Sequence, residues 1–260
     1  MKITLFSSNQ PRHINLVREL SCIADSVYFV SEVNTVFPGK INDFFKKSDT
    51  MQEYFNNVII AEQKAFGDIT FLPTNVRTLA FKFGDLNMAS REQLADALSS
   101  DVFVVFGASY IKGWLIDFLV EKNAFNIHMG LSPYYRGSSC NFWALYDENP
   151  AYVGATIHML SKGLDSGEML FHCVPNLERN DTPFDFTMRS VVVASKGLVE
   201  AIKGEQIFRM VRTKQDKSQE IRYTKNSEFT DLIAREFLDR RLNLHAQEFD
   251  YPNLLSPSLF

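Results

Sequence analysis

The sequence predicts an α/β fold with a mostly parallel β-sheet. A short apolar strand over residues 2–7 is followed by a helix that begins at Pro11 and by a second strand over 27–30. This β-α-β order opens Rossmann-like sheets. Residues 102–106 form a continuous apolar run, Val-Phe-Val-Val-Phe, which is typical of a central parallel strand that helices cover on both faces.

Further elements are expected where apolar residues recur at helical or alternating spacing. The first helix should bury one face through four residues at helical intervals, Ile14, Val17, Leu20 and Ile23. The other elements expected in the first half are a loop over 34–40, a helix over 49–64, a strand over 69–72, a helix that Ser90 caps and that runs to 98, and a helix over 111–119.

The second half of the chain should add three strands and three helices. Thr182, Pro183 and Asp185 form a helix start signal, and a long helix should run from there to about Lys203. The remaining elements are expected as strands over 125–128, 153–160 and 169–174, a short helix over 141–146 and a last helix over 228–241.

Length and charge limit what the protein can be. A chain of 260 residues suits one larger domain with an appendage, which we place at 1–203 and 204–260. The net charge of −4 provides no positive field that would draw the chain to nucleic acid. No run approaches the ~18 apolar residues of a membrane span, so no membrane association is expected. Three scattered cysteines without a CxxC pair indicate reduced thiols and a cytoplasmic location.

A polar pair stands out at the end of one expected strand. Asn126 and His128 are two residues apart, so they project from the same side of a strand whose other side is apolar. The loop that follows, 130–137, is shaped by a proline and a glycine and carries two tyrosines and an arginine. Further along, Asp165 lies between two glycines shortly after another strand. α/β proteins build their sites from such groups at the ends of strands.

Three motifs carry a resemblance to a known family. They are Asn-x-His at 126–128, Ser-Pro-x-Tyr-Arg-Gly at 132–137 and Gly-Leu-Asp-Ser-Gly at 163–167. In this order they resemble the formyltransferases that use N10-formyltetrahydrofolate, a family that includes methionyl-tRNA formyltransferase, glycinamide ribonucleotide formyltransferase and the sugar-nucleotide N-formyltransferases. The resemblance covers roughly residues 1–200. One departure is Gly-Leu-Ser-Pro at 130–133, where the family often has Ser-Leu-Leu-Pro.

The resemblance implies a Rossmann-like formyltransferase domain in which Asn126, His128 and Asp165 are catalytic. Amine formylation needs what these residue types supply. Negative charge grows on the formyl oxygen as the amine attacks, and an amide N–H of Asn126 can bond to that oxygen. His128 titrates near neutral pH, so it can share the oxyanion or manage the proton of the amine. Asp165 would orient His128 or stabilise its charge, and no covalent intermediate is expected.

The resemblance also implies a folate site beside this set. Backbone groups of two loops would bond the pterin ring, and the loop residues concerned are Ser109, Tyr110, Ile111, Lys112, Lys162, Gly163 and Leu164. No metal is expected, because His158 and His172 have no carboxylate or thiolate at a recognisable ligand spacing and suit surface or core roles.

The acceptor should approach from the other side of the set. Its expected contacts are Tyr135, Arg136 and Trp143, although Arg136 could instead brace its own loop. The first helix should begin with side-chain donors that could bind a phosphate or a sugar, from Asn9, Arg12 and His13. Alternatively, Asn9 caps that helix and the other two side chains are solvated.

The identity of the amine separates the members of the family. A tRNA acceptor suits an acidic chain poorly, since phosphate contacts dominate such binding. In addition, only about sixty residues follow residue 200, whereas methionyl-tRNA formyltransferase has a C-terminal domain of about a hundred residues that helps to bind tRNA. The Ser-Ser-Asn-Gln turn at 7–10 lacks the glycines that hold the phosphate in glycinamide ribonucleotide formyltransferase. We therefore expect a dTDP- or UDP-linked amino sugar, used for surface polysaccharide such as O-antigen. The alternatives are hydrolysis of formyl-folate, formyl transfer to another amine, and a non-catalytic folate- or nucleotide-binding module.

The C-terminal region suggests contacts with a partner. Its aromatic residues could supply the surface of a homodimer, and they are Phe229, Phe237, Phe249 and Tyr251. The basic residues between 209 and 225 are expected to form a solvated face, or alternatively to hold phosphates or a partner subunit.

Overall fold

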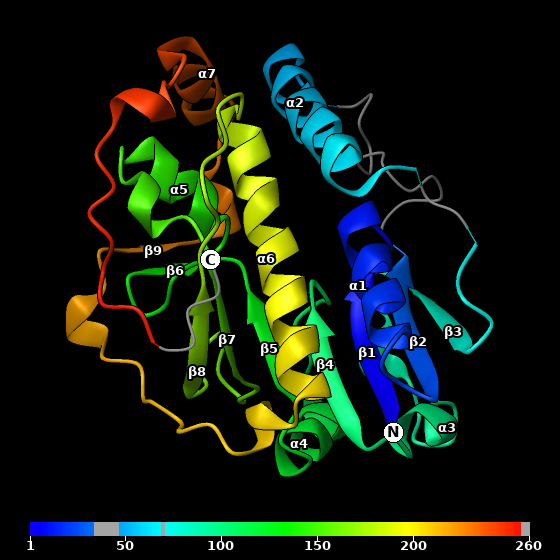
Figure 1. The fold of residues 1–260 in the computed structure, drawn as a ribbon. Helices are drawn as coiled ribbons and strands as arrows, with labels where there is room; N and C mark the ends of the chain where they lie inside the picture. Colours follow the sequence, from blue (N-terminus) through cyan, green and yellow to red (C-terminus); the bar gives the residue numbers. More distant parts are fainter. Residues whose placement is uncertain (34–46, 69–70, 256–260) are drawn as a thin grey trace.

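The computed structural model describes residues 1–33, 47–68 and 71–255. In this part of the chain seven strands form one sheet in the order β3-β2-β1-β4-β5-β7-β8 (Figure 1). The strands are β1 (Lys2–Ser8), β2 (Ser26–Val33), β3 (Val76–Lys82), β4 (Val102–Phe106), β5 (Phe125–His128), β7 (Ala155–Met159) and β8 (Met169–Cys173). The five from β3 to β5 pair in parallel, whereas β7 pairs antiparallel with β5 and β8. The predicted α/β fold with a mostly parallel sheet is confirmed.

Helices cover both faces of this sheet. The α-helices are α1 (Pro11–Ser21), α2 (Asp49–Phe66), α3 (Ala95–Leu98), α4 (Gly113–Glu121), α5 (Cys140–Tyr146), α6 (Pro183–Lys203) and α7 (Asp231–Arg240). Helices α1 and α6 lie on the near face in Figure 1, and α3 and α4 belong to the core of the other face. Side chains of β4 alternate between the two cores, with Val104 in one and Phe103 and Val105 in the other. The predicted central strand is therefore covered on both sides.

Short 3₁₀ helices lie in the connections of the described chain: η2 (Leu86–Met88), η3 (Pro150–Tyr152), η4 (Gln206–Phe208), η5 (Lys217–Gln219), η6 (Asn226–Glu228) and η7 (Leu244–Ala246). No helix in the described ranges is long and apolar enough to cross a membrane.

The start of α6 is the one that the sequence predicts. Thr182 Oγ1 accepts from the backbone N–H of Asp185 at 3.1 Å, and the Asp185 carboxylate accepts from the Thr182 N–H at 3.0 Å. This reciprocal capping box satisfies two backbone donors that the first helical turn leaves without partners.

Several expected boundaries are wrong. Residues 71–72 are not a strand, and 69–70 and the predicted loop over 34–40 lie outside the described residues. The strand β3 lies further on, at Val76–Lys82, where an edge position leaves most side chains exposed and removes the alternating apolar signal. Ser90 does form a reciprocal pair with Gln93, but turns follow it and the helix is confined to α3. The N-cap of α1 is Gln10, not Asn9.

The chain beyond α6 packs back onto the main domain. Strand β9 (Arg222–Thr224) pairs in parallel with β6 (Tyr135–Gly137), and α7 packs against α2. A third core joins Tyr54, Phe142 and Phe237, and Phe229 lies with its ring 4.9 Å from that of Tyr54. Phe229 and Phe237 of the predicted dimer surface are therefore packed within the chain itself. This core also forms one wall of a cavity described below.

Candidate functional site

The polar residues that stand out in the sequence lie together beside the carboxyl end of β5. Asn126 and His128 come from β5 itself, and Asp165 comes from the turn after β7. His128 Nδ1 lies 3.4 Å from Asp165 Oδ2, and Asn126 Nδ2 lies 3.4 Å from Asp165 Oδ1. Asn126 and His128 are both buried. An amide, an imidazole and a carboxylate thus meet at one point, although the carboxylate is distant in sequence.

The turn that carries Asp165 is held from two sides. Gln215 donates from Nε2 to the backbone oxygens of Asp165 at 2.8 Å and of Gly167 at 2.9 Å. Gly167 packs so closely on the Met159 carbonyl that a Cβ atom would overlap it. Asp165 has a φ of 43°, in the left-handed region that residues with side chains rarely adopt. The surrounding contacts over-determine this conformation, as is common at functional sites.

His158 fixes the orientation of the Asn126 amide. It lies opposite Asn126 in the antiparallel pairing of β5 and β7. Its Nδ1 donates to the Met159 carbonyl at 2.8 Å, so the Nε2 of the neutral ring accepts from Asn126 Nδ2 at 2.9 Å. Burial, followed by the charge on His128, lowers the pKa of His158 to about 4. The amide therefore turns its NH₂ group, not its oxygen, toward His158 and Asp165.

His172 also occupies the core role that the sequence suggested. Its Nε2 donates to the Ser132 carbonyl at 2.8 Å, and its Nδ1 accepts from the backbone N–H of Leu255 at 3.0 Å. Burial lowers the pKa of His172 to about 4. Within the described residues, no group of three or more His, Cys, Asp or Glu side chains could hold a metal ion.

Charge at the site is concentrated on His128 and Asp165. Burial by itself would lower the pKa of His128, but the Cys140 sulfur and the Asp165 carboxylate outweigh it and hold that pKa well above its usual value. Burial would raise the pKa of Asp165, but attraction to His128 outweighs it and lowers that pKa. Near neutral pH the pair therefore favours an imidazolium beside a carboxylate, which can hold or release one proton.

One cavity, of about 120 Å³, opens beside Asn126 and Asp165. Both loops that the resemblance implies for the pterin line it, through Ser109, Tyr110, Ile111, Gly163 and Leu164. The loops also touch each other, because the Tyr110 hydroxyl donates to the Lys162 carbonyl at 2.8 Å.

The side chains of the two predicted lysines lie away from this cavity. Lys162 Nζ pairs with Asp117 at 2.6 Å, and Lys112 Nζ lies 5.4 Å from the centre of the Tyr110 ring. The backbone N–H of Lys112 donates to Asn87 Oδ1 at 2.7 Å. Neither lysine side chain faces Asn126 or Asp165, so any contact of these residues with a ligand would come from their backbone.

Glu32 supports the first of these loops. It lies at the carboxyl end of β2 and is fully buried. Its carboxylate accepts from the Ser109 N–H at 2.5 Å, from the Ser109 hydroxyl at 2.8 Å and from the Gly84 N–H at 2.9 Å. A buried carboxylate with three donors anchors a loop far more firmly than surface contacts would. The sequence signal for this role is the single charged residue of this strand, near its end.

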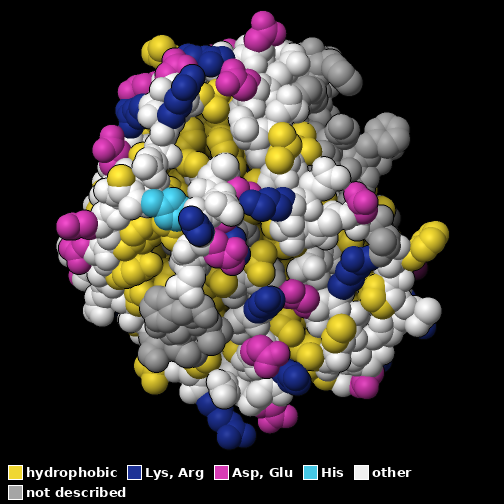
Figure 2. All heavy atoms as spheres, turned by 45° about the horizontal axis from the view of Figure 1, so that its top comes forward, with side chains coloured by type: hydrophobic (Ala, Val, Ile, Leu, Met, Phe, Trp, Pro, Cys, Tyr) yellow, Lys and Arg dark blue, Asp and Glu magenta, His cyan; other side chains and the backbone are white. Residues whose placement is uncertain are grey.

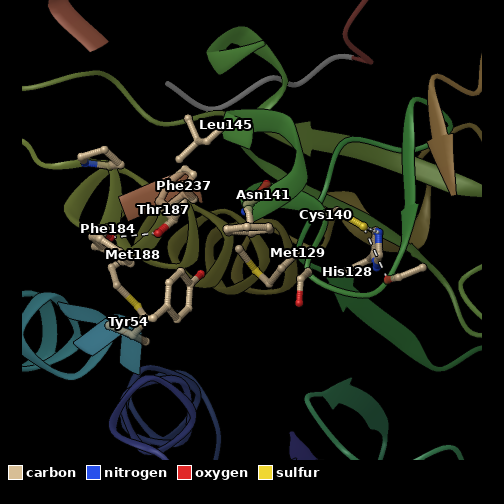
Figure 3. A pocket seen from close by; sticks show the side chains of 15 residues that line it. Tyr54, His128, Met129, Cys140, Asn141, Leu145, Phe184, Thr187, Met188 and Phe237 are labelled. Carbon is tan, nitrogen blue, oxygen red and sulfur yellow. Dashed lines mark hydrogen bonds between the residues drawn. The ribbon is translucent and has the colours of Figure 1, made fainter. Parts of the chain in front are cut away.

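A second cavity, of about 300 Å³, opens on the His128 side of the set (Figure 3). Its walls are mostly apolar, and they include Tyr54, Met129, Phe142, Phe184, Met188 and Phe237, with Cys140 beside His128. Apart from His128, the described side chains that line it are uncharged. On the face seen in Figure 2, recessed hydrophobic side chains likewise lie among interspersed charges of both signs. Most of these residues come from four separate helices, α2, α5, α6 and α7, so no local sequence motif predicts the cavity.

Two of the predicted acceptor contacts belong to the core. Trp143 and Tyr135 are almost fully buried, and the Tyr135 hydroxyl accepts from Asn149 Nδ2 at 2.8 Å. Arg136 NH1 pairs with Glu220 at 2.7 Å, which matches the bracing alternative for this residue. The structure does not bring these three side chains to the walls of either cavity.

The predicted donors at the start of α1 are also engaged. His13 is buried, its Nδ1 accepts from the Gln10 N–H at 3.3 Å, and its ring lies against Phe106. Arg12 NH1 pairs with Glu62 at 2.7 Å and keeps 27% of its side chain exposed. Arg12 therefore retains some access to a ligand, whereas His13 acts as a packing residue.

Comparison with known proteins shows what the segment around the site is similar to. Residues 76–202 match the family model described as formyl transferase, and this segment contains Asn126, His128 and Asp165. The matched segment runs from β3 to α6 and therefore includes β4, β5 and β7 of the sheet. The match covers just under half of the chain.

Curated relatives resemble part of the chain in sequence, and solved structures resemble it in fold. The chain is 30% identical to the methionyl-tRNA formyltransferase of Anaeromyxobacter sp. (strain K) over 123 residues, 47% of this chain and 39% of the relative. It therefore spans well under half the length of that relative. The formyltransferase PseJ from Anoxybacillus kamchatkensis, solved with UDP-4,6-dideoxy-4-formamido-L-AltNAc and tetrahydrofolate, superposes with a TM-score of 0.51 at 17% identity, covering 97% of this chain and 95% of that one. The N-formyltransferase from Helicobacter canadensis, solved with folinic acid and dTDP-3-aminofucose, gives a TM-score of 0.53 at 15% identity, covering 88% and 73%.

Proposed function

We propose that this protein transfers the formyl group of N10-formyltetrahydrofolate to the amino group of a dTDP- or UDP-linked amino sugar. The observation that carries the proposal is the placement of Asn126, His128 and Asp165 between two cavities of different character. A transferase needs one place for the donor and another for the acceptor, with the reacting groups where the two meet.

The three polar residues take the roles that amine formylation requires. One N–H of the Asn126 amide is held by His158, and the other makes only the 3.4 Å contact with Asp165. That second N–H is free to turn to the developing oxyanion. His128 donates from Nδ1 to Asp165, so only the neutral form of the ring, with its lone pair at Nε2 on the side of the second cavity, can take the proton of the amine. Asp165 stabilises the imidazolium that results.

The first cavity suits the folate. Ser109, Tyr110, Ile111 and Gly163 line it, and Glu32 fixes the loop that carries the first three. A flat ring with its own donors and acceptors matches such backbone groups. When bound there, the folate supplies the formyl carbon next to the Asn126 amide.

The second cavity suits the sugar of the acceptor. Aromatic walls and few free polar groups favour a ring with few hydroxyl groups, and the amino group would point to His128. We propose that Arg12, through its exposed part, meets the phosphates. The product would be a formamido sugar for surface polysaccharide such as O-antigen. The solved relatives with bound nucleotide sugars support this acceptor class.

The decisive experiment supplies N10-formyltetrahydrofolate together with a panel of dTDP- and UDP-linked amino sugars. We expect a formylated sugar by mass spectrometry and stoichiometric release of tetrahydrofolate. Failure to form a product with every nucleotide amino sugar in the panel would refute the proposal. Formate release without an acceptor, at the rate of turnover, would instead identify a formyl-folate hydrolase.

Methionyl-tRNA is the second candidate acceptor, because the curated relatives that match in sequence are methionyl-tRNA formyltransferases. Aminoacylated initiator tRNA therefore belongs in the same panel. Its formylation with a strong dependence on salt would favour this candidate, since phosphate contacts govern such binding.

A further inference from the structure

The thiol of Cys140 lies against the imidazole nitrogen that does not face Asp165. Cys140 Sγ is 3.5 Å from His128 Nε2 and also 3.5 Å from the Gly137 carbonyl oxygen. Cys140 and His128 both line the second cavity, and Figure 3 shows them side by side at one end of it. His128 is thus held at both ring nitrogens, by a carboxylate on one side and a thiol on the other.

The local backbone is shaped to permit this contact. A Cβ atom at Gly130 would lie 2.5 Å from Cys140 Cβ, 3.0 Å from His128 Nε2 and 3.1 Å from Cys140 Sγ. The Gly130 carbonyl accepts from the Thr156 hydroxyl at 2.7 Å, so the loop cannot simply move aside. Only a residue without a side chain at position 130 leaves room for the thiol and the imidazole to meet.

One thiol hydrogen serves two acceptors at the same distance. Because the Asp165 carboxylate can only accept, the neutral His128 ring carries its hydrogen on Nδ1 and presents a lone pair at Nε2. The thiol can donate to that lone pair. When Nε2 gains a proton, the S–H can turn to the Gly137 carbonyl, and the sulfur then accepts from Nε2–H. Thiol hydrogen bonds are weak, so this exchange requires little energy.

We propose that Cys140 is a positioning residue for His128, and that its thiol exchanges hydrogen-bond roles with Nε2 as the imidazole gains and loses a proton. The inference rests on the proposed function in one respect only, namely that the acceptor amine is the source of the proton that His128 gains. No bond to sulfur forms or breaks, and Cys140 keeps its own hydrogen throughout.

Three groups face His128 and set its titration. They are Asp165 from the turn after β7, Cys140 from α5, and His158 from β7, whose ring centroid lies 6.3 Å from that of His128. His158 is held neutral, so Asp165 and Cys140 act on the His128 charge. Loss of the sulfur acceptor should make the imidazolium less stable, and the midpoint of His128 titration should fall.

The test follows the ¹⁵N resonances of His128 against pH in the whole protein. In wild type we expect the hydrogen of the neutral ring on Nδ1, and in Cys140→Ala a lower titration midpoint. Gly130→Ala should lower the midpoint in the same direction, since its Cβ would separate the thiol from Nε2. Cys140→Ser should restore much of the wild-type behaviour, because a hydroxyl also donates and accepts. Cys173→Ala, which removes another buried thiol, is the matched control and should leave the midpoint unchanged.

An unchanged midpoint in Cys140→Ala, or an equal shift in Cys173→Ala, would overturn the proposal. If Cys140→Ala does not fold, Gly130→Ala and Cys140→Ser decide by the same measurement. In these variants the acid limb of the pH profile of kcat should shift by as much as the His128 titration midpoint measured by NMR. KM for the formyl donor should stay the same. A protein that shows the shift but forms no formylated product would refute the proposed function and leave the role of Cys140 intact.

Discussion

Replacing Asn126 by alanine tests the amide in two separable ways. In the transition state the variant loses one donor to the oxyanion, which is worth about 3 kcal/mol and corresponds to a fall in kcat of about 10²-fold. In the folded protein it also leaves His158 Nε2 buried without its 2.9 Å donor. The cost of leaving such a group unsatisfied is about 1–3 kcal/mol of unfolding free energy.

The assay measures kcat with saturating formyl donor and acceptor, together with urea unfolding of the same preparation. Asn75→Ala is the matched control, because its amide also donates twice, to the carbonyls of Ser21 at 2.9 Å and Ala24 at 3.1 Å, far from the site. We expect both variants to lose stability and only Asn126→Ala to lose kcat. A kcat for Asn126→Ala within about tenfold of wild type, or an equal fall in Asn75→Ala, would refute the role of this amide.

Three further predictions concern the supports of the site and the fold. Glu32→Ala should cost about 3 kcal/mol of unfolding free energy and raise KM for the formyl donor, because it removes the acceptor for three donors; an unchanged KM would contradict its role at Ser109. His172 has a folded pKa of about 4 against about 6.5 when unfolded, so the unfolded state binds more protons in that window and unfolding free energy should fall by up to about 3 kcal/mol as pH drops from 6.5 to 4. Urea titrations should show a smaller pH dependence in His172→Gln, and equal slopes would argue against this assignment. Thr182→Ala should cost about 1 kcal/mol in thermal unfolding by removing the cap of α6, with no change in KM.

Sequence patterns predicted the parts of the protein in which local and tertiary signals agree. Strand β4 is apolar throughout because both of its faces are covered, and α6 begins where a capping box and a proline coincide. Asn126 and His128 could be placed on one side of β5 from alternation alone. Asp165 was predicted from its position between two glycines, and in the structure it lies beside Asn126 and His128.

The remaining features depend on contacts that no local pattern contains. Strand β3 lies at the edge of the sheet with exposed side chains, so it lacks the apolar alternation that marks a strand. Large aromatic side chains occur both in cores and at binding surfaces, so the sequence could not separate the two roles for Trp143 and Tyr135, which are buried in the core. Cys140 meets His128 only because Gly130 has no side chain, a coincidence that spacing cannot reveal.

Phe237 of α7 closes one wall of the second cavity, together with Tyr54 from α2 and Phe184 at the start of α6. A ligand that fills this space touches a helix that follows the segment matched by the family model, so binding of the ligand and packing of that helix are thermodynamically linked. Saturation with the acceptor should therefore protect the segment after Lys203 from proteases. Replacing α7 with the corresponding helix of a related protein should change the selectivity of the second cavity for its ligand and leave the surroundings of His128 unaltered.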